Sequence, residues 1–370
     1  MYYQITVDPG SVGCKTDLII ICNQESFYTN KNLVMSCVLK QMNNHSIMPL
    51  IILAVVALSL IVFIPSALAY TNYISERTLS PISVVSTRYY VPETLTQLRF
   101  DTELLVNSAI SKFGAGCPPE VAIYVHGFLR NDTEAREEFN RIQTSLNHSN
   151  YRIPLIGFSW NSKTDYPLAQ NNAKDNGPKL AQFIVDFDKR CPDTHIRLVS
   201  HSLGASVVES TLVNLDNNQT LKDSISNNNS KIIKSVHLLG AAINNKSIVN
   251  NTSFVNATEN IVDKFYNLYN PQDDGLEYNR ELENQDPLGL VGAANGTTPL
   301  NYNDTNVAYE IPPFSDADGD GNVEECFEDI KPVRVWGDNH CGYIGFRNPF
   351  VGSFSDDGAM NLVVRDWIKS

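Results

Sequence analysis

The stretch Ser200-His201-Ser202-Leu203-Gly204 contains a serine whose hydroxyl could act as a nucleophile. Apolar residues before this stretch predict a strand and the residues after it predict a helix, so the chain must turn sharply at Ser202. Such a turn strains the backbone and needs small neighbours two residues away on each side. Ser200 and Gly204 are those neighbours, although glycine is the usual residue at the first position. A serine at a helix start can also be a simple N-cap, so the motif alone does not establish catalysis.

A serine hydroxyl becomes a nucleophile near neutral pH only when a neutral imidazole accepts its proton and a carboxylate orients that imidazole. In an open parallel sheet these groups should follow the carboxyl ends of strands. His340 follows the last expected strand, whereas His195 precedes a strand and His237 lies inside one, so His340 is the candidate base. Asp273 and Asp274 follow another expected strand, and both are candidate acids.

The elements that must position these residues alternate along the chain. Continuous apolar runs predict strands buried on both faces. The expected strands cover residues 83–88, 121–128, 153–160, 196–200, 232–243, 262–269 and 333–336. The expected helices cover about 100–113, 133–146, 165–190, 204–215 and 358–369, and Gly177-Pro178 predicts a break or a second start inside the third. Strands that alternate with helices indicate an α/β fold with right-handed crossovers and a parallel sheet.

In the order of these features, the chain resembles the α/β-hydrolase superfamily, in particular its lipase and esterase-like members, from about residue 121 to residue 345. His126-Gly127-Phe128 closes the strand that precedes the oxyanion loop. Ser202 lies in the sharp turn between strand and helix that this family calls the nucleophile elbow, and Asp338-Asn339-His340 follows the last strand. The chain order of serine, aspartate and histidine is the one that this fold uses. The resemblance implies an α/β-hydrolase fold with a mostly parallel sheet and helices on both faces.

The resemblance also implies the chemistry of the site. It assigns Ser202 as the nucleophile and His340 as the base, and it favours Asp273 as the acid because a leucine lies three residues further on, as in many acid loops of the family. The backbone N–H groups of Phe128 and Leu203 would form the oxyanion hole. The implied function is hydrolysis of a carboxylic ester through an acyl-enzyme, with no cofactor for catalysis; ester versus amide stays open. The alternative is a non-catalytic cell-surface glycoprotein that uses the fold as a binding module.

The N-terminal part of the sequence has the pattern of a targeting segment. Residues 50–64 form an apolar run without a charge, and Pro65-Ser66-Ala67-Leu68-Ala69 follows it as a small-residue cleavage pattern. This predicts a signal peptide, with a retained membrane anchor as the alternative. We therefore expect residues 1–69 to be a leader, with Met35 or Met42 as an alternative start, and residues 70–370 to be the hydrolase domain.

The net charge of -13 argues against nucleic acid and anionic membrane surfaces as main partners, because both require a basic patch. The expected partner is a small-molecule or lipid ester substrate, and the expected location is secreted or on the extracellular surface. Asn-X-Ser/Thr acceptors recur after the leader and predict glycosylation, although an asparagine-rich composition also produces them by chance.

Residues of about 277–332 are expected to be an insertion between the acid and the base. Residues 288–292 within it are apolar and flexible enough to line an acyl pocket or form a lid. Further on, four side chains have the spacing of the front half of an EF-hand calcium loop: Asp316, Asp318, Asp320 and Asn322. The sequence therefore predicts a structural Ca²⁺. Phe327 stands where that loop needs a bidentate glutamate, so an acidic, solvated turn is the alternative.

The cysteines divide at the end of the leader. Outside the leader lie Cys117, Cys191, Cys326 and Cys341, an even number that is compatible with two disulfides in an oxidising compartment. In the strand order that the resemblance implies, the strands starting near residues 121 and 196 are neighbours, so Cys117 is expected to pair with Cys191. Cys326 and Cys341 then remain to form the second disulfide.

Overall fold

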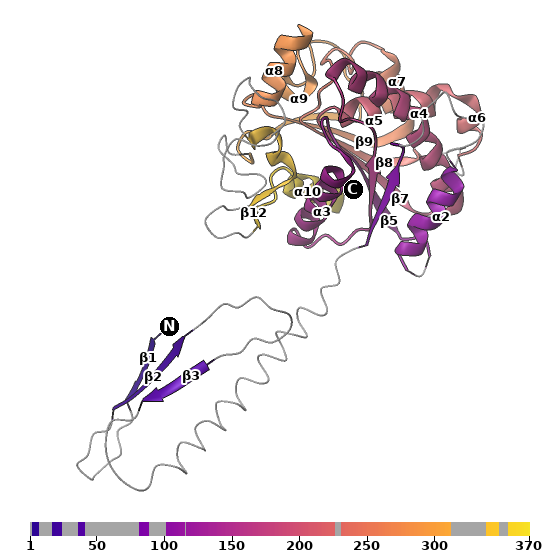
Figure 1. The fold of residues 1–370 in the computed structure, drawn as a ribbon. Helices are drawn as coiled ribbons and strands as arrows, with labels where there is room; N and C mark the ends of the chain where they lie inside the picture. The colour runs from indigo at the N-terminus through magenta and orange to yellow at the C-terminus, as the bar shows by residue number, and fades with distance from the viewer. Residues whose placement is uncertain are drawn as a thin grey trace. The chain divides into compact units, whose positions relative to one another are not determined.

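The computed structural model of the chain describes residues 2–6, 17–23, 36–40, 81–88, 101–114, 116–225, 231–311, 338–347 and 354–370. The chain divides into two compact units, Met1–Thr78 and Leu79–Ser370 (Figure 1). The first unit contains three antiparallel strands, β1 (Tyr2–Thr6), β2 (Asp17–Asn23) and β3 (Ser36–Lys40). The apolar run at 50–64 lies outside the described residues. Among the helices of the described ranges, none is long and apolar enough to cross a membrane.

The second unit is built on a seven-stranded sheet with the order β10-β9-β8-β7-β5-β6-β4. Every pairing between neighbouring strands is parallel. In chain order the strands are β4 (Ile82–Ser86), β5 (Glu120–Val125), β6 (Leu155–Ser159), β7 (His195–His201), β8 (Ile233–Leu239), β9 (Val262–Tyr269) and β10 (Tyr302–Asn306). The predicted α/β fold with a mostly parallel sheet is confirmed.

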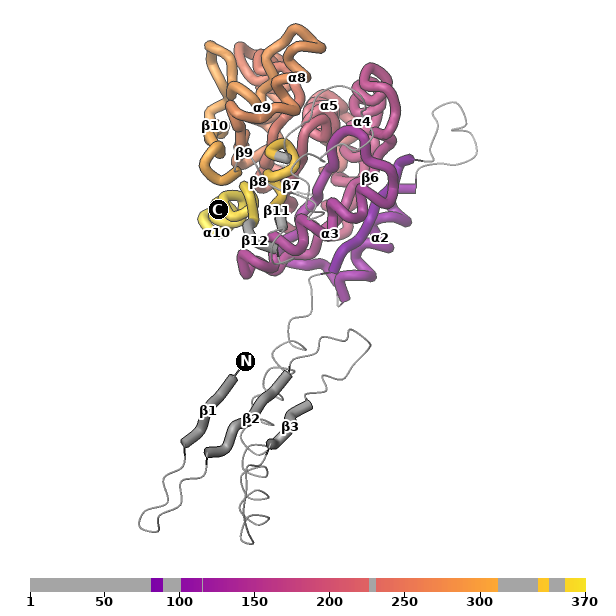
Figure 2. Tube along the Cα trace, turned by 60° about the vertical axis from the view of Figure 1, so that its left-hand side comes forward, coloured from indigo at the N-terminus to yellow at the C-terminus, as the bar shows by residue number. Residues whose placement is uncertain are grey.

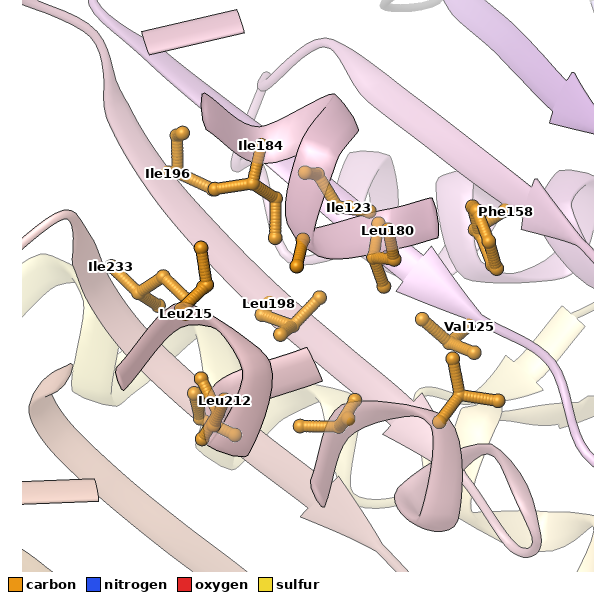
Figure 3. Close-up of a cluster of buried hydrophobic side chains, with 14 of the residues drawn as sticks. Ile123, Val125, Phe158, Leu180, Ile184, Ile196, Leu198, Leu212, Leu215 and Ile233 are labelled. Atoms are coloured by element: carbon orange, nitrogen blue, oxygen red, sulfur yellow. The ribbon is translucent and has the colours of Figure 1, made fainter. Parts of the chain in front are cut away.

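Helices cover both faces of the sheet, because successive residues of each strand point to opposite faces. In β5, Val121, Ile123 and Val125 pack into one core, whereas Ala122 and Tyr124 pack into the other. The helices are α2 (Thr102–Lys112), α3 (Asp132–His148), α4 (Tyr166–Arg190), α5 (Gly204–Asn217), α6 (Gln219–Lys222), α7 (Ser253–Ile261), α8 (Asp274–Glu283), α9 (Leu288–Val291) and α10 (Met360–Lys369). Helices α2, α4, α5 and α7 contribute to the first core, and α3 and α10 to the second. Figure 3 shows the part of the first core in which side chains of α4 and α5 lie against the sheet.

The break predicted at Gly177-Pro178 is wrong, because α4 runs through both residues. Pro178 has no N–H to donate to the carbonyl of Lys174, one turn earlier. The hydroxyl of Ser210 in α5 donates to that carbonyl instead, at 2.7 Å. Gly177 lets α5 come this close, since a Cβ at this position would lie 2.2 Å from Ser210 Oγ.

The segment predicted as an insertion contributes to the packing of the domain. Figure 2 shows α8, α9 and β10 at one end of it. Residues 288–292 were predicted to form a lid or to line an acyl pocket. The segment is anchored at Gly289, whose N–H donates to the Ala241 carbonyl and whose carbonyl accepts from the Asn270 N–H, both at 2.9 Å. This anchoring argues against a mobile lid, and the pocket lining stays a prediction. Leu288 is fully buried. The sequence also missed β10, whose mostly polar residues lack an apolar run.

The C-terminal residues supply the remaining elements. They are the 3₁₀ helices η2 (Asp338–His340) and η3 (Gly342–Ile344) and the antiparallel strands β11 (Phe346–Arg347) and β12 (Phe354–Asp356), followed by α10. The strand predicted at 333–336 lies outside the described residues.

The predicted disulfide between Cys117 and Cys191 is confirmed, with a Cα–Cα distance of 5.4 Å. It joins the segments that lead into β5 and β7, which are parallel neighbours as the resemblance implied. Cys341 is also disulfide-bonded. Its expected partner, Cys326, lies outside the described residues, so that pairing stays a prediction.

Candidate active site

The expected nucleophile lies in a sharp turn between β7 and α5. Ser202 has a φ of +53°, a left-handed conformation that costs a residue other than glycine of order 1–3 kcal/mol. Its N–H donates to the Leu239 carbonyl at 3.0 Å, which holds the turn against β8. Gly204 is required because a Cβ there would lie 2.6 Å from the Val125 carbonyl oxygen. Ser200 lies fully buried in β7, so this departure from glycine is accommodated.

Ser202, His340 and Asp273, which are distant in sequence, form one hydrogen-bonded line. His340 Nε2 lies 2.8 Å from Ser202 Oγ, and His340 Nδ1 lies 2.9 and 2.8 Å from the two carboxylate oxygens of Asp273. All three residues are buried, with exposed fractions of 5%, 3% and 0%. Asp273 is also the N-cap of α8, where its Oδ1 accepts from the Leu276 N–H. Asp274, the other candidate acid, is the first residue of that helix.

This geometry defines what each group can do. A carboxylate beside Nδ1 favours the imidazole tautomer with its proton on that atom. Nε2 of His340 then carries a lone pair that can accept the proton of Ser202 Oγ. The arrangement is therefore one that can activate the serine hydroxyl.

A charged network lies beside His340, and the sequence did not predict it. His201 Nε2 lies 2.6 Å from the His340 carbonyl oxygen, and His201 Nδ1 lies 3.7 Å from Glu138. Arg130 and Tyr124 both donate to the Glu138 carboxylate. Burial alone would raise the pKa of Glu138, but the charge of the Arg130 guanidinium holds this pKa well below its ordinary value. Nothing in the sequence marks Glu138, because a glutamate in a helix is most often solvated.

The two expected oxyanion donors are available. Across the described part of the chain, no protein acceptor receives the N–H of Phe128 or of Leu203. Phe128 lies in the loop of residues 126–131, called here the oxyanion loop. Trp160 supports this loop, because its indole N–H donates to the His126 carbonyl at 2.9 Å and its ring stacks on that of His126.

An aromatic pair lies at the oxyanion loop. The Phe128 ring meets the Tyr166 ring edge-on, with their centroids 5.0 Å apart. The Asn279 side chain of α8 donates to the Tyr166 hydroxyl, which links α8 to the first turn of α4. The Tyr166 ring therefore lies beside Phe128, whose N–H is one of the two expected oxyanion donors.

The predicted calcium ligands Asp316, Asp318, Asp320 and Asn322 lie outside the described residues. Within the described ranges, no group of three or more acidic, histidine or cysteine side chains could hold a metal ion. The calcium site therefore stays a prediction.

Comparisons with known proteins agree with the fold. Residues 107–302, more than half of the chain, match the model of a family described as "Alpha/beta hydrolase of unknown function (DUF900)". No curated protein matches the sequence.

Similar solved structures include the lin2722 gene product of Listeria innocua, which is 12% identical with a TM-score of 0.31 over 50% of this chain and 83% of the other. The catalytic core domain of acetyl xylan esterase from Trichoderma reesei is 13% identical, with a TM-score of 0.31 over 48% of this chain and 97% of the other. A Trichoderma reesei cutinase is 20% identical, with a TM-score of 0.22 over 44% and 71%. At these TM-scores the likenesses carry no argument about activity.

Proposed function

We propose that this chain, which belongs to the DUF900 family of alpha/beta hydrolases, is a serine hydrolase that cleaves carboxylic esters. The observation that carries the proposal is the buried line from Asp273 through His340 to Ser202, with contacts of 2.8–2.9 Å. A binding module has no need of a serine held in a strained turn beside an oriented imidazole.

The proposed reaction follows from these contacts. Ser202 Oγ attacks the ester carbonyl carbon while His340 Nε2 takes the hydroxyl proton, and Asp273 stabilises the imidazolium. The N–H groups of Phe128 and Leu203 bind the oxyanion, which contributes a few kcal/mol to the stability of the transition state. Collapse of the intermediate expels the alcohol, which takes the proton from His340, and leaves an acyl group on Ser202. Water then attacks the acyl-enzyme with His340 as the base, releasing the acid.

The proposal extends to substrate and location. We propose a small-molecule or lipid ester as the substrate, because aromatic side chains lie beside the expected oxyanion donor. We also propose that the protein acts in secreted form or at the extracellular surface. The support is the apolar run at 50–64 and the Cys117–Cys191 disulfide, since disulfides persist in oxidising compartments.

A fluorophosphonate probe and a panel of nitrophenyl esters of increasing acyl length test the function directly. We expect the wild type to be labelled and to hydrolyse at least one ester, and Ser202→Ala to lose both, with kcat lower by a factor of about 10⁴ or more. Ser206→Ala, in the first turn of the same helix, is the matched control and should keep both. An unlabelled wild type would favour the non-catalytic binding module, and a labelled Ser202→Ala protein would assign another nucleophile.

A further inference from the structure

Arg88 follows the edge strand β4, and its side chain is only 8% exposed. Its guanidinium donates hydrogen bonds in several directions. Nε donates to Ser159 Oγ at 2.6 Å, Nη1 donates to the Arg130 carbonyl at 2.9 Å, and Nη2 donates to the Asn131 carbonyl at 3.1 Å. Nη2 also lies 3.1 Å from His126 Nε2. Arg88 therefore contacts the first and the last residues of the oxyanion loop and the end of β6.

The contact with His126 determines which ring nitrogen carries the proton. The backbone N–H of Trp160 also donates to His126 Nε2, at 3.1 Å. Because two N–H groups point at Nε2, this nitrogen is unprotonated, and the proton lies on Nδ1. Nδ1 then donates to the Gly127 carbonyl oxygen at 2.9 Å. Burial, together with the charge of Arg88, lowers the pKa of His126 to about 3, so the ring stays neutral in this tautomer over the working pH range.

This hydrogen bond fixes an adjacent donor. The peptide bond between Gly127 and Phe128 is planar and trans, so a fixed carbonyl holds the Phe128 N–H on the opposite side. A Cβ at Gly127 would lie 2.9 Å from the Cβ of Ser202, which shows that this peptide adjoins the expected nucleophile. Leu129, the next residue, has a φ of +54°, and its N–H donates to the Ser162 carbonyl. The loop is therefore constrained on both sides of Phe128.

We propose that Arg88 is a positioning residue, which holds the oxyanion loop in the shape that aims the Phe128 N–H at the developing oxyanion. The inference rests on the proposed function, because an oxyanion forms only if Ser202 attacks a carbonyl. A donor that is fixed in advance needs no reorganisation during the reaction. The planar guanidinium reaches four acceptors at once, which the single ammonium of lysine cannot do.

The kinetic test compares Arg88→Lys and Arg88→Met with the wild type. Both variants should lower kcat by about 10- to 100-fold, with KM changed by less than about three-fold, because the lost interaction acts only in the transition state. The rate of fluorophosphonate labelling should fall in parallel. Arg152→Met, at an exposed arginine between α3 and β6, is the control for loss of a cation and should leave kcat unchanged. Wild-type kcat in both Arg88 variants, or full rescue by lysine, would overturn the proposal.

A second measurement does not depend on activity. In full-length protein with ¹⁵N-labelled phenylalanine, the amide signal of Phe128, identified by its loss in Phe128→Leu, should shift in Arg88→Lys and in Arg88→Met but not in Arg152→Met. An unmoved signal in a folded Arg88→Lys protein would overturn the positioning role even if the wild type is a hydrolase. An inactive, unlabelled wild type with the expected shifts would instead contradict the proposed function and leave Arg88 as the residue that sets the loop geometry.

Discussion

In the proposed reaction His340 must keep its position while it gains and loses a proton. The neighbouring His201 ring binds the His340 backbone carbonyl at 2.6 Å. The two rings have centroids only 4.8 Å apart. A positive charge on His201 would therefore disfavour the imidazolium that His340 forms when it takes the serine proton. Burial lowers the pKa of His201, which favours the uncharged ring. The backbone of His340 is thus held by a histidine whose burial opposes a second positive charge beside it.

The charge of Glu138 can be removed with little change of shape. Glu138→Gln removes the carboxylate that pairs with the largely buried guanidinium of Arg130, so we expect the free energy of unfolding at neutral pH to fall by about 3 kcal/mol. Urea denaturation followed by circular dichroism measures this difference. Glu137→Gln, at the exposed neighbouring position, is the matched control and should change stability by less than about 0.5 kcal/mol.

The pH dependence of this difference follows from the direction of the pKa shift. The folded pKa of Glu138 lies well below its ordinary value of 4.5. A carboxyl of this kind stabilises the fold above its unfolded pKa, and the stabilisation is lost as the pH falls through the folded pKa. The gap between wild type and Glu138→Gln should therefore be full at pH 7 and shrink below about pH 4.5. An equal difference in stability at pH 7 and below about pH 4.5 would contradict the stabilising role of the Glu138 charge.

At the scale of elements, the contact between α4 and α5 shows how one helix can supply a hydrogen-bond donor that a proline removes from another. Pro178 leaves the Lys174 carbonyl without its helical partner, and Ser210 from α5 supplies the missing donor. This hydrogen bond also joins two helices of the core that lies under the elbow. The α5 helix that begins beside the nucleophile is thereby tied to a long neighbour.

A double-mutant cycle tests whether Ser210 compensates for Pro178. Ser210→Ala alone should lower the free energy of unfolding by about 0.5–1 kcal/mol, the usual contribution of one hydrogen bond. In the Pro178→Ala background the same change should cost almost nothing, because the new N–H of residue 178 can donate to the Lys174 carbonyl. Urea denaturation of the four proteins gives the coupling energy. Equal costs of Ser210→Ala in the two backgrounds would show that the contact does not compensate for the proline.

These elements also show where sequence reasoning succeeds and where it stops. Apolar runs predicted the strands from β5 to β9, because burial on both faces requires apolar side chains. Strand β10 has no such run, since it lies at an edge with mostly exposed residues. The break predicted at Pro178 was wrong because the compensating donor is Ser210, 36 residues away in the sequence from the Lys174 carbonyl that it satisfies. The contacts of Arg88 could not be predicted for the same reason, because its acceptors lie in segments that only the folded chain brings together.

At the scale of the whole domain, the candidate active site and the disulfide lie at opposite ends of the strands of the parallel sheet. Ser202 and Asp273 follow the carboxyl ends of β7 and β9, where an open parallel sheet places its site. The residues of the proposed triad could be named from the sequence, with Asp274 as an alternative acid, because their types follow strands in the chain order of the family. Their distances could not be, since these depend on how the strands are ordered. The Cys117–Cys191 disulfide lies at the other ends of the strands, before β5 and β7.

This separation predicts that the disulfide affects stability and not turnover. The bridge closes a loop with a sequence separation of 74 residues, so replacing both cysteines by serine should lower the free energy of unfolding by about 4 kcal/mol. The seven residues of β7, at about 3.3 Å each, put roughly 20 Å between the bridge and Ser202. We therefore expect kcat on the best nitrophenyl ester to stay within about two-fold of wild type at a temperature where both proteins are folded. Guanidinium denaturation and initial rates measure the two quantities on the same preparation. A large loss of kcat with little loss of stability would contradict this prediction. It would mean that the amino ends of β5 and β7 control the geometry of the candidate active site.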